Sequence, residues 1–147
     1  MGNNLDIRVM SGCEILEAIR DGKIDAPAIS QTMPMDLIEV EPGRVLFHAK
    51  ADARHLNPLG RVHGGFAATV LDAATGCAVH TMLDAGVGFG TVELDVKMMR
   101  PVPVDKKLIA AGKLLSLTRS IGFAEGTLRD EDGKMFAHAT ATCMVIR

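Results

Sequence analysis

The carboxylate of Asp72 has the setting that most suggests chemistry. Between His63 and His80 the chain is apolar or small on nearly all sides, and Asp72 is its only charged residue. A carboxylate there loses hydration, and no basic residue one helical turn away offsets that cost. Two interpretations stay open: an Asp that accepts hydrogen bonds from backbone groups across an interface, or a carboxylate held in a partly dry pocket for catalysis. Small Ala and Gly neighbours leave room for a ligand and favour the second.

The entrance to the same segment is the second chemical feature. His63, Gly64 and Gly65 place two residues without side chains where the pattern predicts the start of a helix. Backbone N–H groups at a helix N-terminus point outward and favour negative charge. Such a terminus can serve as an oxyanion hole for an ester or thioester carbonyl. The sequence carries neither the phosphate-loop pattern nor a dinucleotide-binding glycine pattern, so phosphate transfer is not expected.

The spacing of these two features constrains how they can cooperate. Gly64 and Asp72 are eight residues apart, which is about 12 Å along a helix. A general base must lie within about 3 Å of its proton or act through one water. One helix therefore does not present both groups to one small carbonyl. If both act in one site, two antiparallel helices from two subunits must pair, which predicts a homodimer with two composite sites.

The elements that must position these groups follow from residue patterning. A capping box at Ser11 predicts a short helix that Gly22 ends, and a hairpin follows from Met33 with its turn at Pro42-Gly43. A long helix is expected from His63 to about Leu83. Four extended segments are then expected, at 91–99, 107–117, 121–130 and 134–145. This order predicts an α+β layer in which an antiparallel sheet packs on one central helix.

Alternation within the first of these extended segments assigns its faces. Val92 and Leu94 fall on the face that we expect to be buried, whereas Thr91 and Glu93 fall on the polar face.

Composition excludes several classes of protein. The 147 residues are 48% hydrophobic and carry a net charge of −2, which suits one globular domain and offers no electrostatic footprint for nucleic acid. No apolar run is long enough to span a bilayer, and no secretory signal is evident, so we expect a cytoplasmic protein. The three cysteines and five histidines show no ligand spacing, and no metal site is expected.

The motif residues resemble the hotdog-fold acyl-CoA thioesterases of the phenylacetate-degradation type. The matching pattern is N-x-x-G-x-x-H-G-G, from Asn57 to Gly65, followed by an acidic residue seven positions later, at Asp72. The resemblance covers 33–147, which we expect to form the thioesterase domain, and leaves 1–32 as an N-terminal extension with a short accessory helix. It implies a hotdog fold, in which an antiparallel sheet wraps around a long central helix.

The resemblance also implies roles for individual residues. Asp72 would be the general base or the nucleophile toward the thioester, and the Gly64 N–H would polarise its carbonyl. Asn57 would help to hold the base or the attacking water, and His63 would shape the site. Thr91 would orient water near Asp72, although its place on the polar face of the strand argues against this.

Contacts to the coenzyme A part of a substrate are also implied. Gly65, Arg100, Arg119 and Ser120 are the candidate substrate-binding residues, with solvated loop cations as the alternative interpretation of the two arginines. Coenzyme A would enter as part of the substrate, so no cofactor is expected. The predicted reaction is hydrolysis of an acyl-CoA to a carboxylic acid and coenzyme A, by a homodimer or by a tetramer assembled from two dimers.

Two other functions and the identity of the acyl group stay open at this point. A hotdog hydratase or dehydratase of 3-hydroxyacyl thioesters would pair a His base with a carboxylate, and a non-catalytic acyl-CoA binding protein would lack turnover. Methionines could line an adaptable apolar pocket, namely Met33, Met35, Met82, Met98 and Met99. With five Phe and no Trp or Tyr, no aromatic platform for the acyl group is expected.

Overall fold

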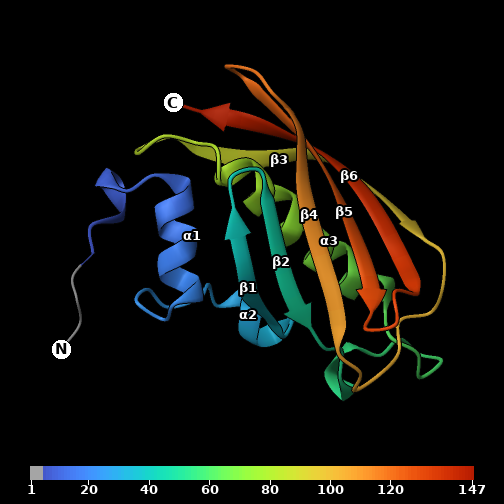
Figure 1. Ribbon diagram of the computed structural model, residues 1–147. Helices are drawn as coiled ribbons and strands as arrows, with labels where there is room; N and C mark the ends of the chain where they lie inside the picture. The colour runs from blue at the N-terminus through green and yellow to red at the C-terminus, as the bar shows by residue number, and fades with distance from the viewer. Residues whose placement is uncertain (1–4) are drawn as a thin grey trace.

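A computed structural model describes residues 5–147 as one sheet with a helix packed across it (Figure 1). The helical elements are a 3₁₀ turn at Ile7–Val9, α1 at Gly12–Arg20, α2 at Ile29–Thr32, a second 3₁₀ turn at Ala53–His55 and α3 at Gly64–His80. The strands are β1 at Met35–Glu41, β2 at Arg44–Ala49, β3 at Gly88–Met98, β4 at Leu108–Leu117, β5 at Ile121–Asp130 and β6 at Met135–Ile146.

All six strands belong to a single antiparallel sheet, in the order β1-β2-β4-β5-β6-β3. Tight turns connect neighbours where the sequence predicts them, and Gly43 and Gly133 adopt the positive φ angles that these turns require. In Figure 1 the sheet curves around α3, so the expected α+β hotdog architecture is confirmed. Strands β1 and β3 form the two edges, and β3 pairs only with β6 within the described chain.

The centre of the fold is the packing of α3 on the concave face of the sheet. Phe66, Val70, Leu71 and Val79 are almost fully buried, which explains why this helix is apolar around most of its circumference. The sheet comes very close where it lacks side chains: a Cβ added at Gly112 of β4 would lie 2.0 Å from the carbonyl oxygen of Ala74. The helix is three residues shorter than predicted at its C-terminal end.

A bulge in β3 reverses the expected facing of its first residues. The register against β6 shifts between Thr91 and Glu93, so that Val92 is the extra residue. Val92 is therefore 61% exposed, and Thr91 pairs with the buried Cys143 on the face that meets α3. The prediction of a buried Val92 and an outward Thr91 was wrong because strict alternation fails at a bulge.

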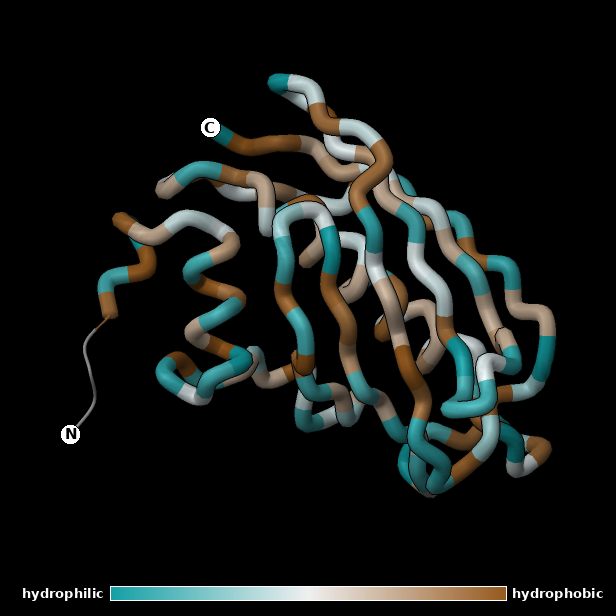
Figure 2. The backbone as a smooth tube through the Cα atoms, in the orientation of Figure 1, coloured by the Kyte–Doolittle hydropathy of each residue, from teal (hydrophilic) through white to brown (hydrophobic). Residues whose placement is uncertain are grey.

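The N-terminal residues pack beside β1 rather than within the sheet. Helix α1 begins with the predicted capping box, in which Ser11 Oγ accepts from Glu14 N–H and the Glu14 carboxylate accepts from Ser11 N–H. Its buried residues, including Leu16 and Ala18, face the core, and hydrophobic and hydrophilic residues alternate along this helix (Figure 2). Helix α2 was not predicted, because four residues are too short to show a helical period. Among the described helices, none is long and apolar enough to cross a membrane.

The close approach at Gly112 yields a stability test. Gly112→Ala should lower the free energy of unfolding by at least about 2 kcal/mol, because the new methyl group would have to displace the α3 backbone. Gly88→Ala is the matched control: its Cβ would meet only the Ile146 carbonyl oxygen at 4.0 Å. We expect the control to stay within about 0.5 kcal/mol of the wild type in urea unfolding. Equal stability of the two variants would contradict this account of the packing.

Candidate active site

Buried polar contacts hold the chain that leads into α3. The His55 ring lies between two backbone groups, accepting from Asp52 N–H at Nδ1 (2.9 Å) and donating from Nε2 to the Thr32 carbonyl (2.6 Å). The His55 carbonyl in turn accepts from His63 N–H at 2.7 Å. The ring also packs against Phe66 on α3. This anchors the residue before the helix to the core, so that the helix entrance is held in place.

His63 caps the helix with its own side chain. Its Nδ1 accepts from Gly65 N–H at 2.8 Å, and its carbonyl accepts from Phe66 N–H at 3.0 Å. Because Nδ1 is the acceptor, the ring proton is assigned to Nε2. The N–H of Gly64 donates to no acceptor in residues 5–147, so it is the free donor at this helix start. Gly65, predicted to contact substrate, donates its N–H to this cap.

The loop before the helix is shaped by Asn57. Its side-chain oxygen accepts from Leu59 N–H (2.9 Å) and Arg61 N–H (3.1 Å), and its backbone pairs with Arg61. The amide nitrogen of the side chain is left for other partners. Asn57 thus orders the loop and also borders the pocket described next.

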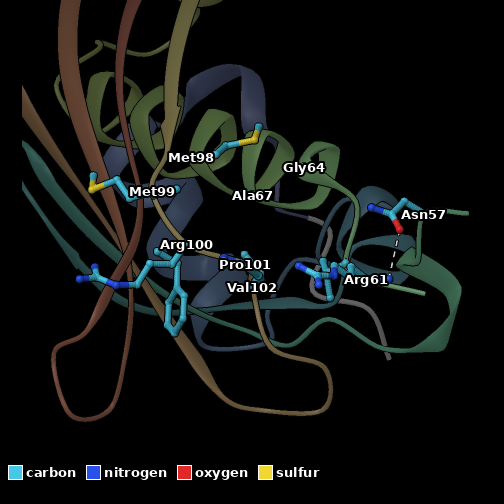
Figure 3. Close-up of a pocket in the computed structure, with 12 residues that line it drawn as sticks. Asn57, Arg61, Gly64, Ala67, Met98, Met99, Arg100, Pro101 and Val102 are labelled. Atoms are coloured by element: carbon cyan, nitrogen blue, oxygen red, sulfur yellow. Dashed lines mark hydrogen bonds between the residues drawn. The ribbon is translucent and has the colours of Figure 1, made fainter. Parts of the chain in front are cut away.

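A pocket of about 340 Å³ opens beside the free Gly64 N–H (Figure 3). The loop at Asn57 and Arg61, the start of α3 and the chain after β3 surround it. The remaining lining residues are Val62, Ala67, Met98, Met99, Arg100, Pro101, Val102, Phe136 and Ala137. A Cβ at position 64 would lie 2.6 Å from the Met98 sulfur, so a larger residue there would displace the Met98 side chain that borders the pocket.

Two arginines border this pocket, and they differ in orientation. The Arg100 guanidinium donates to the Met135 carbonyl at 2.8 Å and extends away from Asn57 and Gly64 (Figure 3). Arg61 lies beside Asn57 and was not singled out in the sequence. Its position three residues before Gly64, within the motif loop, was the available signal.

Asp72 lies two turns further along α3 and does not line this pocket. Its Oδ1 atom is buried and accepts no hydrogen bond within the described chain. Leaving a buried acceptor unpaired costs on the order of 1–3 kcal/mol, and more for a charged group. Burial, and then the negative charge of Asp72, raise the pKa of the Cys77 thiol to about 12.

The face of α3 that carries Asp72 meets the start of β3. One turn after Asp72, a Cβ at Gly76 would lie 2.9 Å from the Phe89 ring and 3.9 Å from the Thr91 hydroxyl. The Cys143 thiol lies 3.8 Å from that hydroxyl, and its pKa is raised by burial and, more weakly, by Asp72. The bulge therefore turns Thr91 toward the side of the helix that holds Asp72.

Arg119 and Ser120 lie at the opposite end of the sheet from this pocket. They form the turn between β4 and β5, where the Ser120 carbonyl accepts from Val145 N–H near the end of β6. The pocket contacts the start of β6, at Phe136. Within one chain these two residues are therefore far from Gly64 and Arg100.

Phenylalanine and methionine side chains line both cavities. Phe136 lines the pocket at Gly64, and Phe47 lines a second cavity between α1 and α3. The expectation that the acyl group meets no aromatic platform stays a prediction. Met98 and Met99 line the first cavity and Met35 the second, as predicted. The other two do not line either cavity: Met33 packs against the core and Met82 is 45% exposed.

The groups that the site offers can be stated in chemical terms. No group of three His, Cys, Asp or Glu side chains within residues 5–147 is placed to hold a metal ion. What the chain offers is a buried carboxylate with an unpaired oxygen and a helix N-terminus with a free N–H, which are a base or nucleophile and a carbonyl-polarising donor.

Comparison with known proteins assigns the family. The model of the thioesterase superfamily matches residues 59–137, more than half of the chain. Mouse acyl-coenzyme A thioesterase 13 is 24% identical over 107 residues, which cover 72% of this chain and 76% of that protein.

Solved structures agree with this assignment. A phenylacetic acid degradation-related protein from Ralstonia eutropha JMP134 is 30% identical with a TM-score of 0.80, over 88% of this chain and 98% of that one. The E. coli PaaI protein of the phenylacetic acid degradation operon shares the fold, with a TM-score of 0.80 at 17% identity over 93% of this chain and 97% of that one. The chain belongs to the thioesterase superfamily.

Proposed function

We propose that this protein hydrolyses acyl-CoA thioesters to a carboxylic acid and coenzyme A, with Asp72 as the catalytic carboxylate. The observation that carries the proposal is the buried, unpaired Oδ1 atom of Asp72. Within the described chain that oxygen meets no donor, which leaves the free lone pair that a general base needs for the proton of water. Membership of the thioesterase superfamily, and similarity to a protein named acyl-coenzyme A thioesterase, favour this substrate class.

The reaction requires a second group at the carbonyl oxygen, and we assign it to the Gly64 N–H. Water adds to the thioester carbon while Asp72 takes its proton, and the oxygen that gains negative charge accepts from Gly64 N–H. The carbon–sulfur bond then breaks, and the coenzyme A thiolate leaves and is protonated. Thr91, turned toward the Asp72 side of α3 by the bulge, is suited to hold the attacking water.

Both groups meet one carbonyl only if two copies combine. Helix α3 runs antiparallel to the edge strand β3, since Gly64 lies against Met98 and Gly76 lies against Phe89. Antiparallel pairing of β3 with the same strand of a second copy would place the Gly64 end of each helix beside the Asp72 end of the other. It would also cover the outer edge of β3, which pairs with no strand in the described chain. We therefore propose a homodimer with two composite sites.

The hydratase alternative fits the helix entrance less well. It needs a histidine with a free basic nitrogen, but Nδ1 of His63 is occupied by Gly65 N–H and Nε2 then carries the proton. Using His63 as a base would break the cap that holds the oxyanion donor. We therefore assign His63 as a positioning residue rather than a base.

The central test is Asp72→Asn. We expect kcat for acyl-CoA hydrolysis to fall by at least about 10²-fold, because an amide neither accepts the proton nor attacks the carbonyl. Release of the coenzyme A thiol, followed with a thiol reagent, measures this directly. Asp84→Asn makes the same change in the exposed turn after α3 and should leave kcat within about twofold. Near-normal turnover of the Asp72 variant would remove the proposal.

Single-turnover hydrolysis in ¹⁸O-water tests how Asp72 acts. If it activates water, the label enters the product acid and mass spectrometry of the protein finds none in the peptide containing Asp72. Attack by Asp72 itself would form an anhydride, and hydrolysis at the Asp carbonyl would leave ¹⁸O in that peptide. We expect an unlabelled peptide, because the role that we propose for Thr91 is to hold water beside the carboxylate. A labelled Asp72 would replace the general-base step with the anhydride route.

Substitutions at His63 separate capping from direct chemistry. His63→Ala should lower the free energy of unfolding by about 1 kcal/mol and kcat by about tenfold, because Gly65 N–H loses its acceptor and the helix entrance loosens. His63→Asn supplies a side-chain oxygen suited to the same cap. It should restore the free energy of unfolding and bring kcat to within about threefold of the wild type. If the Asn variant regains stability but stays as slow as the Ala variant, the imidazole itself contacts the reacting atoms.

A further inference from the structure

A second cavity of about 180 Å³ lies between the N-terminal residues and α3. Helices α1 and α2 and the segment between them form one side, β1 and β2 form another, and Ala73 and Cys77 of α3 form the third. The family match begins only at residue 59, so most of this wall lies outside the matched segment. The catalytic scheme above does not use this cavity.

The cavity is lined by apolar side chains that are held in place by the core. Leu16, Met35 and Phe47 are each at most 6% exposed, and they pack together with Leu37 and Ile19. A surface so lined favours hydrocarbon and leaves a charged group without hydration.

The few polar residues that border the cavity do not offer a site for a charged ligand. The Arg20 guanidinium already pairs with Asp21, with Nε 3.0 Å from Oδ1, and Asp36 is exposed. The remaining polar residue, Ser30, carries no charge. The cavity therefore suits an uncharged apolar group.

Its place on α3 connects this cavity to the proposed catalytic carboxylate. Ala73 directly follows Asp72, and Cys77 is one turn further along the same wall. The charge of Asp72 also contributes to the raised pKa of the Cys77 thiol, which lines this wall. A thioester carbon held at Asp72 would therefore have this cavity beside it.

The two cavities differ in polarity, as the coenzyme and acyl ends of an acyl-CoA do. The pocket at Gly64 is bordered by Arg61 and the Asn57 amide, which suit the phosphate and amide groups of coenzyme A. The cavity at Ala73 is hydrocarbon on its walls. A substrate spanning both would place its coenzyme at the first and its acyl group in the second.

We propose that this cavity is the acyl-binding pocket and that the N-terminal residues set the length of the acyl group. An engineered cavity of about 150 Å³ holds benzene, so about 180 Å³ accommodates an uncharged group of about six to eight carbons. A straight chain and an aryl-acetyl group both meet that description. This inference rests on the proposed hydrolysis of acyl-CoA thioesters.

Affinity of the unmodified protein for non-hydrolysable alkyl-CoA thioethers tests the size of the pocket. Measured by isothermal titration from methyl to hexadecyl, the affinity should rise about threefold to fourfold per methylene and level off near eight carbons. A chain ending in a carboxylate should bind no better than methyl. A rise that continues to sixteen carbons, or no rise at all, would overturn the inference.

Substitution of Ile19 tests whether the N-terminal helix sets that limit. Ile19→Ala enlarges the cavity, so the acyl length with the highest kcat/KM should move up by two to three carbons. Ala73→Leu fills the cavity and should lower the ratio of octanoyl-CoA to acetyl-CoA hydrolysis at least tenfold. The same measurement with phenylacetyl-CoA shows whether hydrolysis of an aryl substrate changes in the same direction. Ile7→Ala is the matched control, because Ile7 is 53% exposed and lies outside the cavity.

The outcomes keep the two proposals apart. If no acyl-CoA is hydrolysed by the wild type, the proposed function fails. If hydrolysis depends on Asp72 while the Ile19 and Ala73 variants keep the wild-type length profile, only the acyl pocket is wrong. Ile19→Val and Ala73→Val are milder changes with the same expected signs, so a variant that does not fold leaves the test intact.

Discussion

The close packing of α3 against the concave face of the sheet is the constraint on which the rest of the structure depends. Where Gly112 meets the Ala74 carbonyl there is no space for even one methyl group. The helix is consequently buried on the side facing the sheet, and the residues left partly open on its remaining surface include Gly65, Thr69, Asp72, Ala73, Cys77 and His80. Among these partly open residues, Asp72 is the one acidic side chain.

The same packing stabilises the fold enough to tolerate an unpaired carboxylate oxygen. An orphaned buried oxygen costs stability, and the fold compensates through the apolar contacts of Phe66, Leu71 and Val79 around the same helix. Sites that hold unsatisfied polar groups are where local rules are broken for function. The tight helix–sheet contact therefore offsets the cost of the unsatisfied oxygen on the same helix.

The sequence predicted the fold well because its main elements have strong local signals. The apolar helix, the Ser11 capping box and the turns at Gly43 and Gly133 depend on neighbouring residues alone. It failed at Val92, where a bulge depends on register against a distant strand, and alternation has no means to show this. The cavities could not be predicted from the sequence either, since Arg61 and Phe136 border one pocket although they are 75 residues apart in the chain.

The direction of α3 relative to β3 connects chemistry, assembly and specificity. Because the two elements are antiparallel, the end of the strand near Met98 lies at the helix entrance and the end near Phe89 lies near Asp72. A two-fold axis through the edge strand would exchange these ends between copies. The cavity that we propose for the acyl group is lined by residues of a single chain, so it would stay within that chain. In such an assembly the partner would supply the polarising N–H, and each chain's own N-terminal helices would select its acyl group.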